Sequence, residues 1–287
     1  MKILVLCSGG DSPGMNYCMY SLLKMGRRHT FYGAIAGFKG LIESNFVKLE
    51  LKTFSRYKDI AGSIIKSSRC PEFKTKKGVK SAVKNIRENN FDCVIVLGGD
   101  GSYRGCVELS QNDINVIFIP ATIDRDLPYP TYSIGFLSAV FACSEYILQV
   151  MNSFDSFDRT GVFEVMGRDN SSICKMVSEI VNADLCITSE NFNNIEYDKL
   201  DKTNKSQIVV LQENLLNIEN LCENLEEHLQ TEVKGCVIGY LQRGIDPVAN
   251  EKKLCSILAK LAIKSINKKM FNRAMSLNEN LAQTIDI

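Results

Sequence analysis

Two carboxylates separated by one residue stand just after an apolar run, in residues 120–126 (PATIDRD). The run itself, residues 116–119 (VIFI), is typical of a buried strand. Open α/β sheets bind their ligands beyond the carboxyl ends of the strands. If the chain stays extended, Asp124 and Asp126 point the same way, so one could act as a base and the other orient it. An ordinary polar loop with a turn aspartate explains this segment equally well.

Two glycine-rich segments occupy similar places earlier in the chain. Residues 8–16 (SGGDSPGMN) follow the apolar run 3–7, and residues 98–102 (GGDGS) follow the apolar segment 92–97. Glycines let a backbone approach a ligand closely, and the amides at the start of a following helix favour an anion. An aspartate among them can hold Mg²⁺ on nucleotide phosphates. The first segment is neither a Walker loop nor GxGxxG, so a tight turn with structural glycines stays open for it.

Expected strands and helices alternate along the chain. This pattern predicts an α/β protein whose largely parallel sheet is covered on both faces. Besides the three strands above, strands are expected at residues 32–36, 46–54, 160–165, 185–188, 208–211 and 234–238. Helices are expected at residues 15–28, 75–88, 103–111, 133–150, 171–181, 216–230 and 249–269.

The composition is that of an ordinary globular protein, with 287 residues, 45% of them apolar, and a net charge of +1. No basic block suggests nucleic acid, and no apolar run approaches the ~20 residues of a membrane helix. The eleven cysteines are scattered, without a CxxC pair or a signal peptide. We therefore expect a reduced, cytoplasmic protein of one large domain or two lobes.

In chain order, these motifs resemble those of the bacterial-type 6-phosphofructokinases. Residues 8–16, 98–102 and 120–126 match the family's SGGDxPGMN, GGDGS and PGTIDND. Its ARFPEF, YTIGF, EVMGR and HIQRGG segments correspond to residues 68–73 (SRCPEF), 132–136 (YSIGF), 164–168 (EVMGR) and 240–245 (YLQRGI). The resemblance implies a glycolytic kinase that transfers a phosphoryl group from ATP to the 1-hydroxyl of fructose 6-phosphate, giving fructose 1,6-bisphosphate.

The resemblance also implies an architecture. Two lobes, each a mostly parallel sheet flanked by helices, would hold the active site in the cleft between them. Residues 1–134 and about 242–287 would bind the nucleotide, and about 135–241 the sugar phosphate. The family is oligomeric, commonly a tetramer that is a dimer of dimers. Residues 276–280 match its last inner strand region, so the closing C-terminal segment is expected to be missing.

The implied catalytic set is led by Asp124, the general base that would take the proton from the sugar 1-hydroxyl. Thr122 and Asp126 would position the sugar and support that base. The other members, whose amide or guanidinium groups would neutralise the transferring phosphoryl, are Gly10, Arg69 and Arg168.

The implied ligand sets are larger. Asp100 would be the ligand of Mg²⁺, and Arg243 would clamp the 6-phosphate together with Arg159 and Lys234 of a neighbouring subunit. The ATP set is Gly10, Arg69, Cys70, Gly99, Asp100, Gly101 and Ser102. The sugar-phosphate set is Thr122, Ile123, Asp124, Arg159, Met166, Gly167, Arg168, Glu213, Lys234, Tyr240 and Arg243.

Several residues depart from the family pattern. Pyrophosphate users have larger polar residues at Gly101 and Ala121, so the small side chains here favour ATP. Arg125 stands where asparagine is usual; strand alternation would point it away from the carboxylates, whose basicity it would lower if it turned inward. Ile245 stands where the family has a glycine, and a β-branched residue does not easily adopt a positive φ.

Other substitutions affect the sugar-phosphate and effector sites. Tyr240 replaces a histidine, Lys234 replaces an arginine, and Tyr20 replaces an effector-site arginine, so we expect weak regulation. These changes leave open a catalytically weak or regulatory subunit that binds sugar phosphate or nucleotide. A third interpretation is a GGDG-type kinase that acts on NAD or diacylglycerol. The motifs PATIDRD and EVMGR together argue against it.

Overall fold

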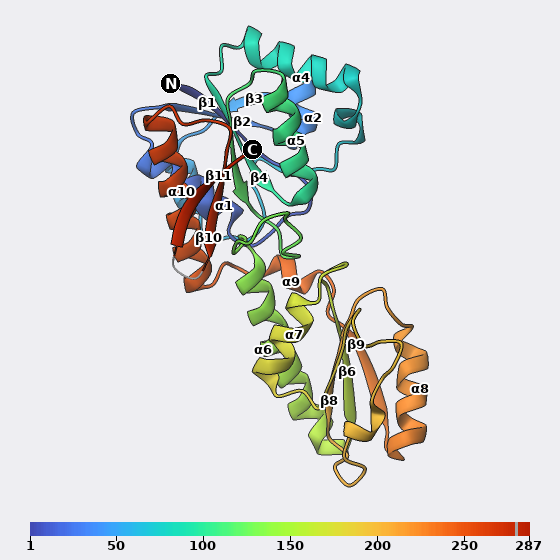
Figure 1. Ribbon diagram of the computed structural model, residues 1–287. Coiled ribbons are helices and arrows are strands. Elements are labelled where there is room, and N and C mark those ends of the chain that lie inside the picture. The colour runs from blue at the N-terminus through green and yellow to red at the C-terminus, as the bar shows by residue number, and fades with distance from the viewer. Residues whose placement is uncertain (279–280) are drawn as a thin grey trace. The chain divides into compact units, whose positions relative to one another are not determined.

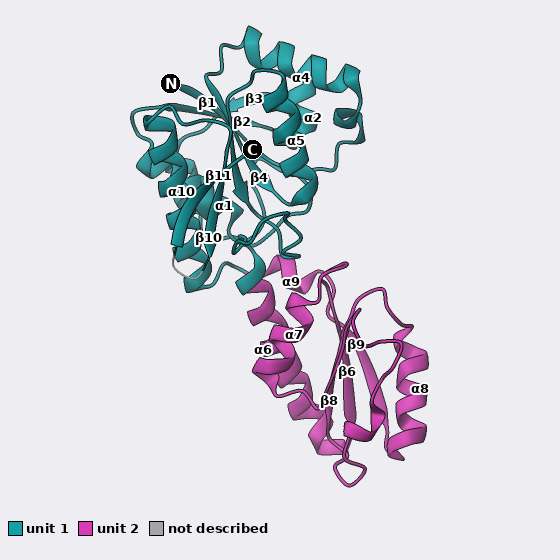
Figure 2. Ribbon diagram, in the orientation of Figure 1, with its two compact units in different colours: residues 1–137, 246–287 teal, residues 138–245 magenta. Residues whose placement is uncertain are grey.

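The computed structural model describes residues 1–278 and 281–287, so part of the segment 276–280 lies outside the described residues. The chain divides into two compact units, which are coloured separately in Figure 2. Unit 1 comprises residues 1–137 and 246–287, and unit 2 comprises residues 138–245. The boundaries expected after residues 134 and 241 fall a few residues earlier. Both units are α/β, so the expected fold class is confirmed.

Unit 1 contains a seven-stranded sheet with strand order β11-β10-β5-β4-β1-β2-β3. Its five inner strands are parallel, and the two edge strands are antiparallel to their neighbours. The strands are β1 (Lys2–Cys7), β2 (Thr30–Ala34), β3 (Phe46–Lys48), β4 (Cys93–Gly98), β5 (Val116–Pro120), β10 (Arg273–Asn278) and β11 (Leu281–Asp286).

Helices cover both faces of this sheet (Figure 1), and for that reason its central strands are continuous apolar runs. One face carries α1 (Met15–Met25), α3 (Leu51–Tyr57) and α10 (Ala249–Asn267). The other carries α2 (Phe38–Ile42), the 3₁₀ turn η1 (Pro71–Lys74), α4 (Lys76–Glu88) and α5 (Asp100–Gln111). All six residues of β4 are buried.

The strand expected over residues 46–54 is wrong in its second half. Strand β3 ends at Lys48, and helix α3 begins at Leu51 after the extended residue Glu50. Leu51 and Phe54, three residues apart, share a face of the helix, and Phe54 is buried in the core beside α1. Burial of the Phe54 ring in the core therefore favours a helix here, although the mixed polar sequence of this segment had suggested a strand.

Unit 2 contains a four-stranded parallel sheet with strand order β7-β8-β6-β9. Its strands are β6 (Thr160–Val165), β7 (Leu185–Ile187), β8 (Ile208–Gln212) and β9 (Val233–Val237). Figure 1 shows α6 (Phe136–Phe154) and α7 (Ser172–Val181) on one face and α8 (Ile218–Leu229) on the other. The remaining elements are η2 (Asp155–Phe157), η3 (Tyr197–Lys199) and the short helix α9 (Leu241–Gly244). No helix among the described residues is long and apolar enough to cross a membrane.

Replacing Phe118 by alanine tests the core of unit 1. Phe118 is fully buried in the central strand β5 and contacts the ring of Tyr103, whose centroid lies 5.4 Å away. Removing the ring leaves a cavity, so we expect the free energy of unfolding to fall by about 3–5 kcal/mol. Urea denaturation measures this loss. Leu281→Ala, at a side chain 62% exposed, is the control and should change stability by less than about 0.5 kcal/mol.

Candidate active site

The loops after β1, β4 and β5 of unit 1 meet at one edge of the sheet. Because these strands are adjacent and parallel, their carboxyl ends lie side by side. The Ser8 amide donates to the Leu97 carbonyl (2.9 Å), and the Ser102 hydroxyl donates to the Ser8 carbonyl (3.1 Å). The Ala121 amide donates to the Gly98 carbonyl (2.8 Å). The structure therefore brings together the first glycine-rich segment, GGDGS and PATIDRD.

The glycines of the second segment differ in what surrounds them. A Cβ on Gly98 would lie 2.3 Å from the Ser102 hydroxyl oxygen and 2.6 Å from the Ser8 carbonyl oxygen, so the close approach of the loops requires glycine there. A Cβ on Gly101, in the first turn of α5, would meet nothing within 4 Å. The small residue at position 101 is thus not required by packing and leaves open space at a helix N-terminus.

Arg69 lies on a loop that is tied to the first glycine-rich segment. The Ser67 hydroxyl donates to the Gly9 carbonyl (2.8 Å), and the Gly9 amide donates to the Ser68 carbonyl (3.3 Å). Arg69 itself is exposed, and the following Cys70 directly precedes η1, where its carbonyl accepts a hydrogen bond from the Phe73 amide (3.2 Å). The expected residues Gly10 and Arg69 are therefore carried by two loops that hold each other.

Asp100, the expected metal ligand, starts helix α5 and forms an ion pair with Arg104. Two contacts join them, Nε to Oδ1 at 3.3 Å and an NH₂ nitrogen to Oδ2 at 2.9 Å. The Arg104 side chain is 77% exposed, so it can swing away from the carboxylate. Arg104 was not among the site residues expected from the sequence, although the i,i+4 spacing of opposite charges in a helix is a signal for it.

The turn from Thr122 to Asp126 is not extended. The Asp124 amide donates to the Thr122 hydroxyl (3.2 Å), the backbone bends at Ile123 and Asp124, and Arg125 has a φ of +52°. The premise that Asp124 and Asp126 share one face of an extended segment is therefore wrong. Ile123 is buried and anchors the turn, while Thr122 and both aspartates are half-buried.

Arg125 is placed by two aromatic rings of the segment 132–136. Its guanidinium carbon lies 5.4 Å from the ring centroid of Tyr132 and 4.9 Å from that of Phe136, which is fully buried. Such contacts stabilise a cation by about 0.5–2 kcal/mol. The left-handed φ also explains the asparagine usual at this position, since asparagine adopts that conformation more readily than most residues.

The carboxyl-terminal edge of the unit 2 sheet carries a second group of expected residues. Met166, Gly167 and Arg168 follow β6, Glu213 follows β8, and the segment 240–243 follows β9. The Glu213 carboxylate accepts hydrogen bonds from the amides of Gly167 (2.9 Å) and Arg168 (2.8 Å). The loop after β6 is thus held in a fixed shape around that carboxylate.

Two buried glutamines, neither of them among the site residues expected from the sequence, complete this support. The Gln212 amide nitrogen donates to the Arg168 carbonyl (2.7 Å), and the Gln242 side-chain oxygen accepts from the Met166 amide (3.2 Å). Both glutamines are fully buried. Each glutamine has a signal in the sequence, because Gln212 ends strand β8 and Gln242 directly precedes the expected clamp residue Arg243.

Burial, together with Glu213, raises the pKa of the nearby Glu164 carboxyl.

The segment after β9 forms the short helix α9. Tyr240 is 76% exposed, and its ring centroid lies 5.1 Å from the guanidinium carbon of Arg243. Tyr240 thus contacts the expected clamp residue directly. Ile245 has a φ of −73°, so the strain expected for a β-branched residue at this position is absent.

Arg159 and Lys234 lie at the opposite end of the unit 2 sheet from Arg168. They stand at the amino-terminal ends of β6 and β9 and share Glu232, with contacts of 2.5 and 2.7 Å. The six residues of β6 separate them from the loop of Arg168, which corresponds to roughly 20 Å. Arg159 and Lys234 therefore do not join the other sugar-phosphate residues of unit 2 within one chain.

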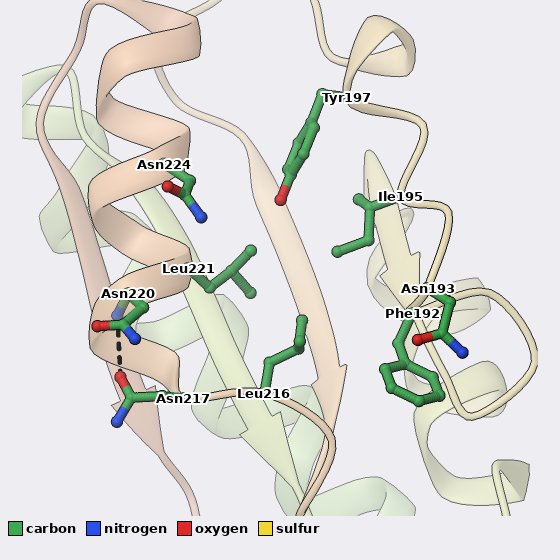
Figure 3. A pocket seen from close by; sticks show the side chains of 9 residues that line it. All are labelled: Phe192, Asn193, Ile195, Tyr197, Leu216, Asn217, Asn220, Leu221 and Asn224. Atoms are coloured by element: carbon green, nitrogen blue, oxygen red, sulfur yellow. Dashed lines mark hydrogen bonds between the residues drawn. The ribbon is translucent and has the colours of Figure 1, made fainter.

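A cavity of about 350 Å³ opens beside α8 in unit 2 (Figure 3). Its lining combines apolar side chains, among them Phe192, Leu216 and Leu221, with four asparagines, most of which belong to α8 or its N-cap. The Asn217 side chain accepts a hydrogen bond from the Asn220 amide and so caps α8 (2.9 Å). None of the expected site residues lines this cavity, which is separate from the loops described above.

Exchanging Arg125 tests the turn. Alanine removes both ring contacts and does not favour a left-handed φ, so we expect Arg125→Ala to lower the free energy of unfolding by about 1–3 kcal/mol. Arg125→Asn loses the same contacts but tolerates the backbone, so its loss should be smaller. Denaturant titration of both variants measures the difference. An equal loss of unfolding free energy in the two variants would mean that the backbone conformation of residue 125 does not contribute to stability.

Comparison with known proteins places the chain in a family. The Phosphofructokinase family model matches residues 2–266. The ATP-dependent 6-phosphofructokinase of Finegoldia magna is 31% identical over 99% of this chain and 92% of its own length. The enzyme of the same name from Staphylococcus carnosus is 34% identical over 91% of this chain and 84% of its own.

Solved structures agree on the fold. A phosphofructokinase from Saccharomyces cerevisiae has a TM-score of 0.88 at 22% identity, covering 99% of this chain and 44% of the yeast chain. A pyrophosphate-dependent phosphofructokinase from Marinobacter aquaeolei has a TM-score of 0.85 at 16% identity, covering 99% of this chain and 81% of that chain. The chain thus shares its fold with a phosphofructokinase whose title names pyrophosphate, while the two sequence relatives above carry the name of the ATP-dependent enzyme. This chain belongs to the phosphofructokinase family.

Proposed function

We propose that this protein transfers the γ-phosphoryl group of ATP to the 1-hydroxyl of fructose 6-phosphate. The observation that carries the proposal is the meeting of the two glycine-rich loops with PATIDRD at one sheet edge of unit 1. The relatives named ATP-dependent 6-phosphofructokinase support both substrates. The reaction belongs to glycolysis, and we expect the enzyme to work in the cytoplasm.

The donor is assigned to unit 1. The open space at Gly101 leaves room for the inner phosphates of ATP, and the amides of Gly10 and of the first turn of α5 favour an anion. Asp100 would hold Mg²⁺ after Arg104 moves away, since Mg²⁺ is usually bound by one or two carboxylates and by substrate phosphates. Bound Mg²⁺ would neutralise phosphate charge.

The chemical step is assigned to Asp124. Its carboxylate would accept the proton of the sugar 1-hydroxyl, an effect typically worth about 10²–10⁴ in rate. The Thr122 hydroxyl accepts a hydrogen bond from the Asp124 amide and thereby stabilises the turn. Asp126 would support the base. Arg69 and Arg168 would neutralise the transferring phosphoryl group, whose reaction depends on positioning and electrostatics.

The sugar phosphate is assigned to unit 2. The loop of Met166, Gly167 and Arg168, held by Glu213, would bind the sugar, and Arg243 with Tyr240 would bind the 6-phosphate. Arg159 and Lys234 stand too far along β6 and β9 to reach this loop in their own chain. We therefore propose that they complete the site of a neighbouring subunit in a dimer of dimers.

The Asp124→Ser variant tests the proposed base. We expect kcat to fall by about 10²–10⁴ while KM for fructose 6-phosphate changes by less than about threefold. A coupled assay that detects fructose 1,6-bisphosphate in the presence of ATP and Mg²⁺ measures both constants. Asp198→Ser, at an exposed aspartate of unit 2, is the matched control and should leave them unchanged.

Two results of this assay would contradict the proposal in different ways. Unchanged kcat in Asp124→Ser would remove Asp124 as the base. Absence of turnover in the unsubstituted protein, together with tight binding of fructose 6-phosphate in calorimetry, would identify a regulatory subunit instead.

Co-expression of two defective variants tests the sharing of sites between subunits. One chain carries Asp124→Ser, and the other carries Arg159→Ala with Lys234→Ala. In a mixed oligomer, the second chain keeps its own Asp124 and receives intact Arg159 and Lys234 from the first. We expect activity at limiting fructose 6-phosphate well above that of either variant alone.

The matched control pairs Asp124→Ser with Arg243→Ala. Asp124 and Arg243 are proposed to serve the same chain's site, so every site of this mixed oligomer lacks one of them and no activity returns. Equal activity in the two mixtures would contradict a site shared in this way.

A further inference from the structure

Two cysteines of unit 2 face each other across the contact between α7 and β7. The sulfur of Cys174, in the first turn of α7, lies 3.7 Å from the sulfur of Cys186, in the middle of β7. The expected catalytic machinery includes neither residue. A disulfide has an S–S length of about 2 Å, so a modest approach of the two sulfurs would close the bond.

The alternation of β7 explains why Cys186 meets α7. Leu185 and Ile187 pack into the core on the α8 side of the sheet, so Cys186 between them points to the opposite face. Cys174 is buried there, with its sulfur 3.5 Å from the Ile187 carbonyl and 3.6 Å from the Val210 carbonyl. Because β7 is the edge strand of the sheet, Cys186 keeps partial exposure.

A polar cluster joins the same two elements beside the cysteines. Glu190, just beyond β7, accepts hydrogen bonds from the Lys175 ammonium (2.5 and 2.6 Å) and from the Ser171 hydroxyl (3.2 Å). These contacts hold the start of α7 against the end of β7, and so they keep the two sulfurs close to each other.

The surroundings also favour the reactive form of Cys186. A hydrogen bond with Cys174, assisted by Ser178 and Lys175, lowers the pKa of the Cys186 thiol to about 6, against the opposing effects of burial and of Glu190. The same contact and burial raise the pKa of Cys174. Cys186 is also the partly exposed member of the pair, so it is the thiol that a reagent in solution can reach, whereas Cys174 is fully buried behind it.

We propose that Cys174 and Cys186 form a site of reversible oxidation, at which a peroxide converts the two thiols into an intrachain disulfide. The Cys186 thiolate attacks one peroxide oxygen, the O–O bond breaks, and Cys186 becomes a sulfenic acid as hydroxide leaves. Cys174 then attacks the sulfenic sulfur, the S–OH bond breaks, and the Cys174 proton leaves with the hydroxide as water. The hydroxide from the first step takes up the proton that Cys186 released on ionising, so in sum two thiols lose two electrons and one peroxide becomes two waters. A small dithiol reverses the reaction by thiol–disulfide exchange.

Peptide mapping of the full-length protein tests the proposal. The reduced protein is treated with a few equivalents of hydrogen peroxide, denatured, alkylated and digested. We expect one crosslink between the peptides of Cys174 and Cys186, a mass loss of about two hydrogen atoms, and recovery of both thiols with dithiothreitol. A link between other cysteines, or sulfinic acid at Cys186 without any link, would overturn the proposal.

The pH dependence of alkylation is a second, independent readout. A thiol with a pKa near 6 is already mostly ionised at pH 7. The rate of alkylation of Cys186 in the unsubstituted protein should therefore rise less than twofold between pH 7 and pH 9. An ordinary thiol with a pKa near 8.5 gains roughly twentyfold over this range. Cys222, half-buried in the same unit with a pKa raised to about 11, is the internal control and should rise steeply.

Two variants separate the roles of the cysteines. Cys174→Ser should leave Cys186 open to oxidation beyond the sulfenic acid, because the resolving thiol is gone. Cys186→Ser should abolish the crosslink and leave Cys174 unmodified at the same peroxide dose. Oxidation of Cys174 in the latter variant at the original rate would show that Cys186 is not the attacking group.

Discussion

The parallel pairing of β1, β4 and β5 is the constraint on which the proposed chemistry depends. Parallel neighbours in register end at the same edge, so three loops far apart in the chain come together there. The close approach then requires a glycine at position 98, because any side chain would strike Ser102 and Ser8. Gly101, in the first turn of α5, instead faces open space.

Unit 2 achieves the same end with different groups. Its loop after β6 bends around the Glu213 carboxylate and two buried glutamines, which pair with backbone groups of residues 166–168. Backbone amides left unpaired in such a place would cost about 1–3 kcal/mol each. A side chain expected to bind sugar therefore also shapes the loop, so a substitution at Glu213 changes both the backbone and the contact surface.

Much of the fold was predictable, because buried parallel strands are apolar runs and helices show their own period. The glycine-rich segments and the two carboxylates of PATIDRD predicted a candidate site for the same reason, since both signals are local in sequence. The failures came where tertiary contacts override local pattern. Phe54 turns part of an expected strand into helix α3 by inserting into the core, and the ring contacts of Arg125 accompany a left-handed turn where an extended segment was expected.

The α/β class, the order of the loops and the residue types available for phosphoryl transfer could all be predicted from the sequence. Periodicity and motif spacing involve residues within a few positions of each other, and these can be read directly. Which distant groups meet could be seen only in the folded chain. Glu213 meets the Gly167 amide, Cys174 meets Cys186, and Arg159 meets Glu232 and not the loop of Arg168. These contacts depend on strand register and on which face a side chain takes, and a shift of one residue would reverse that face.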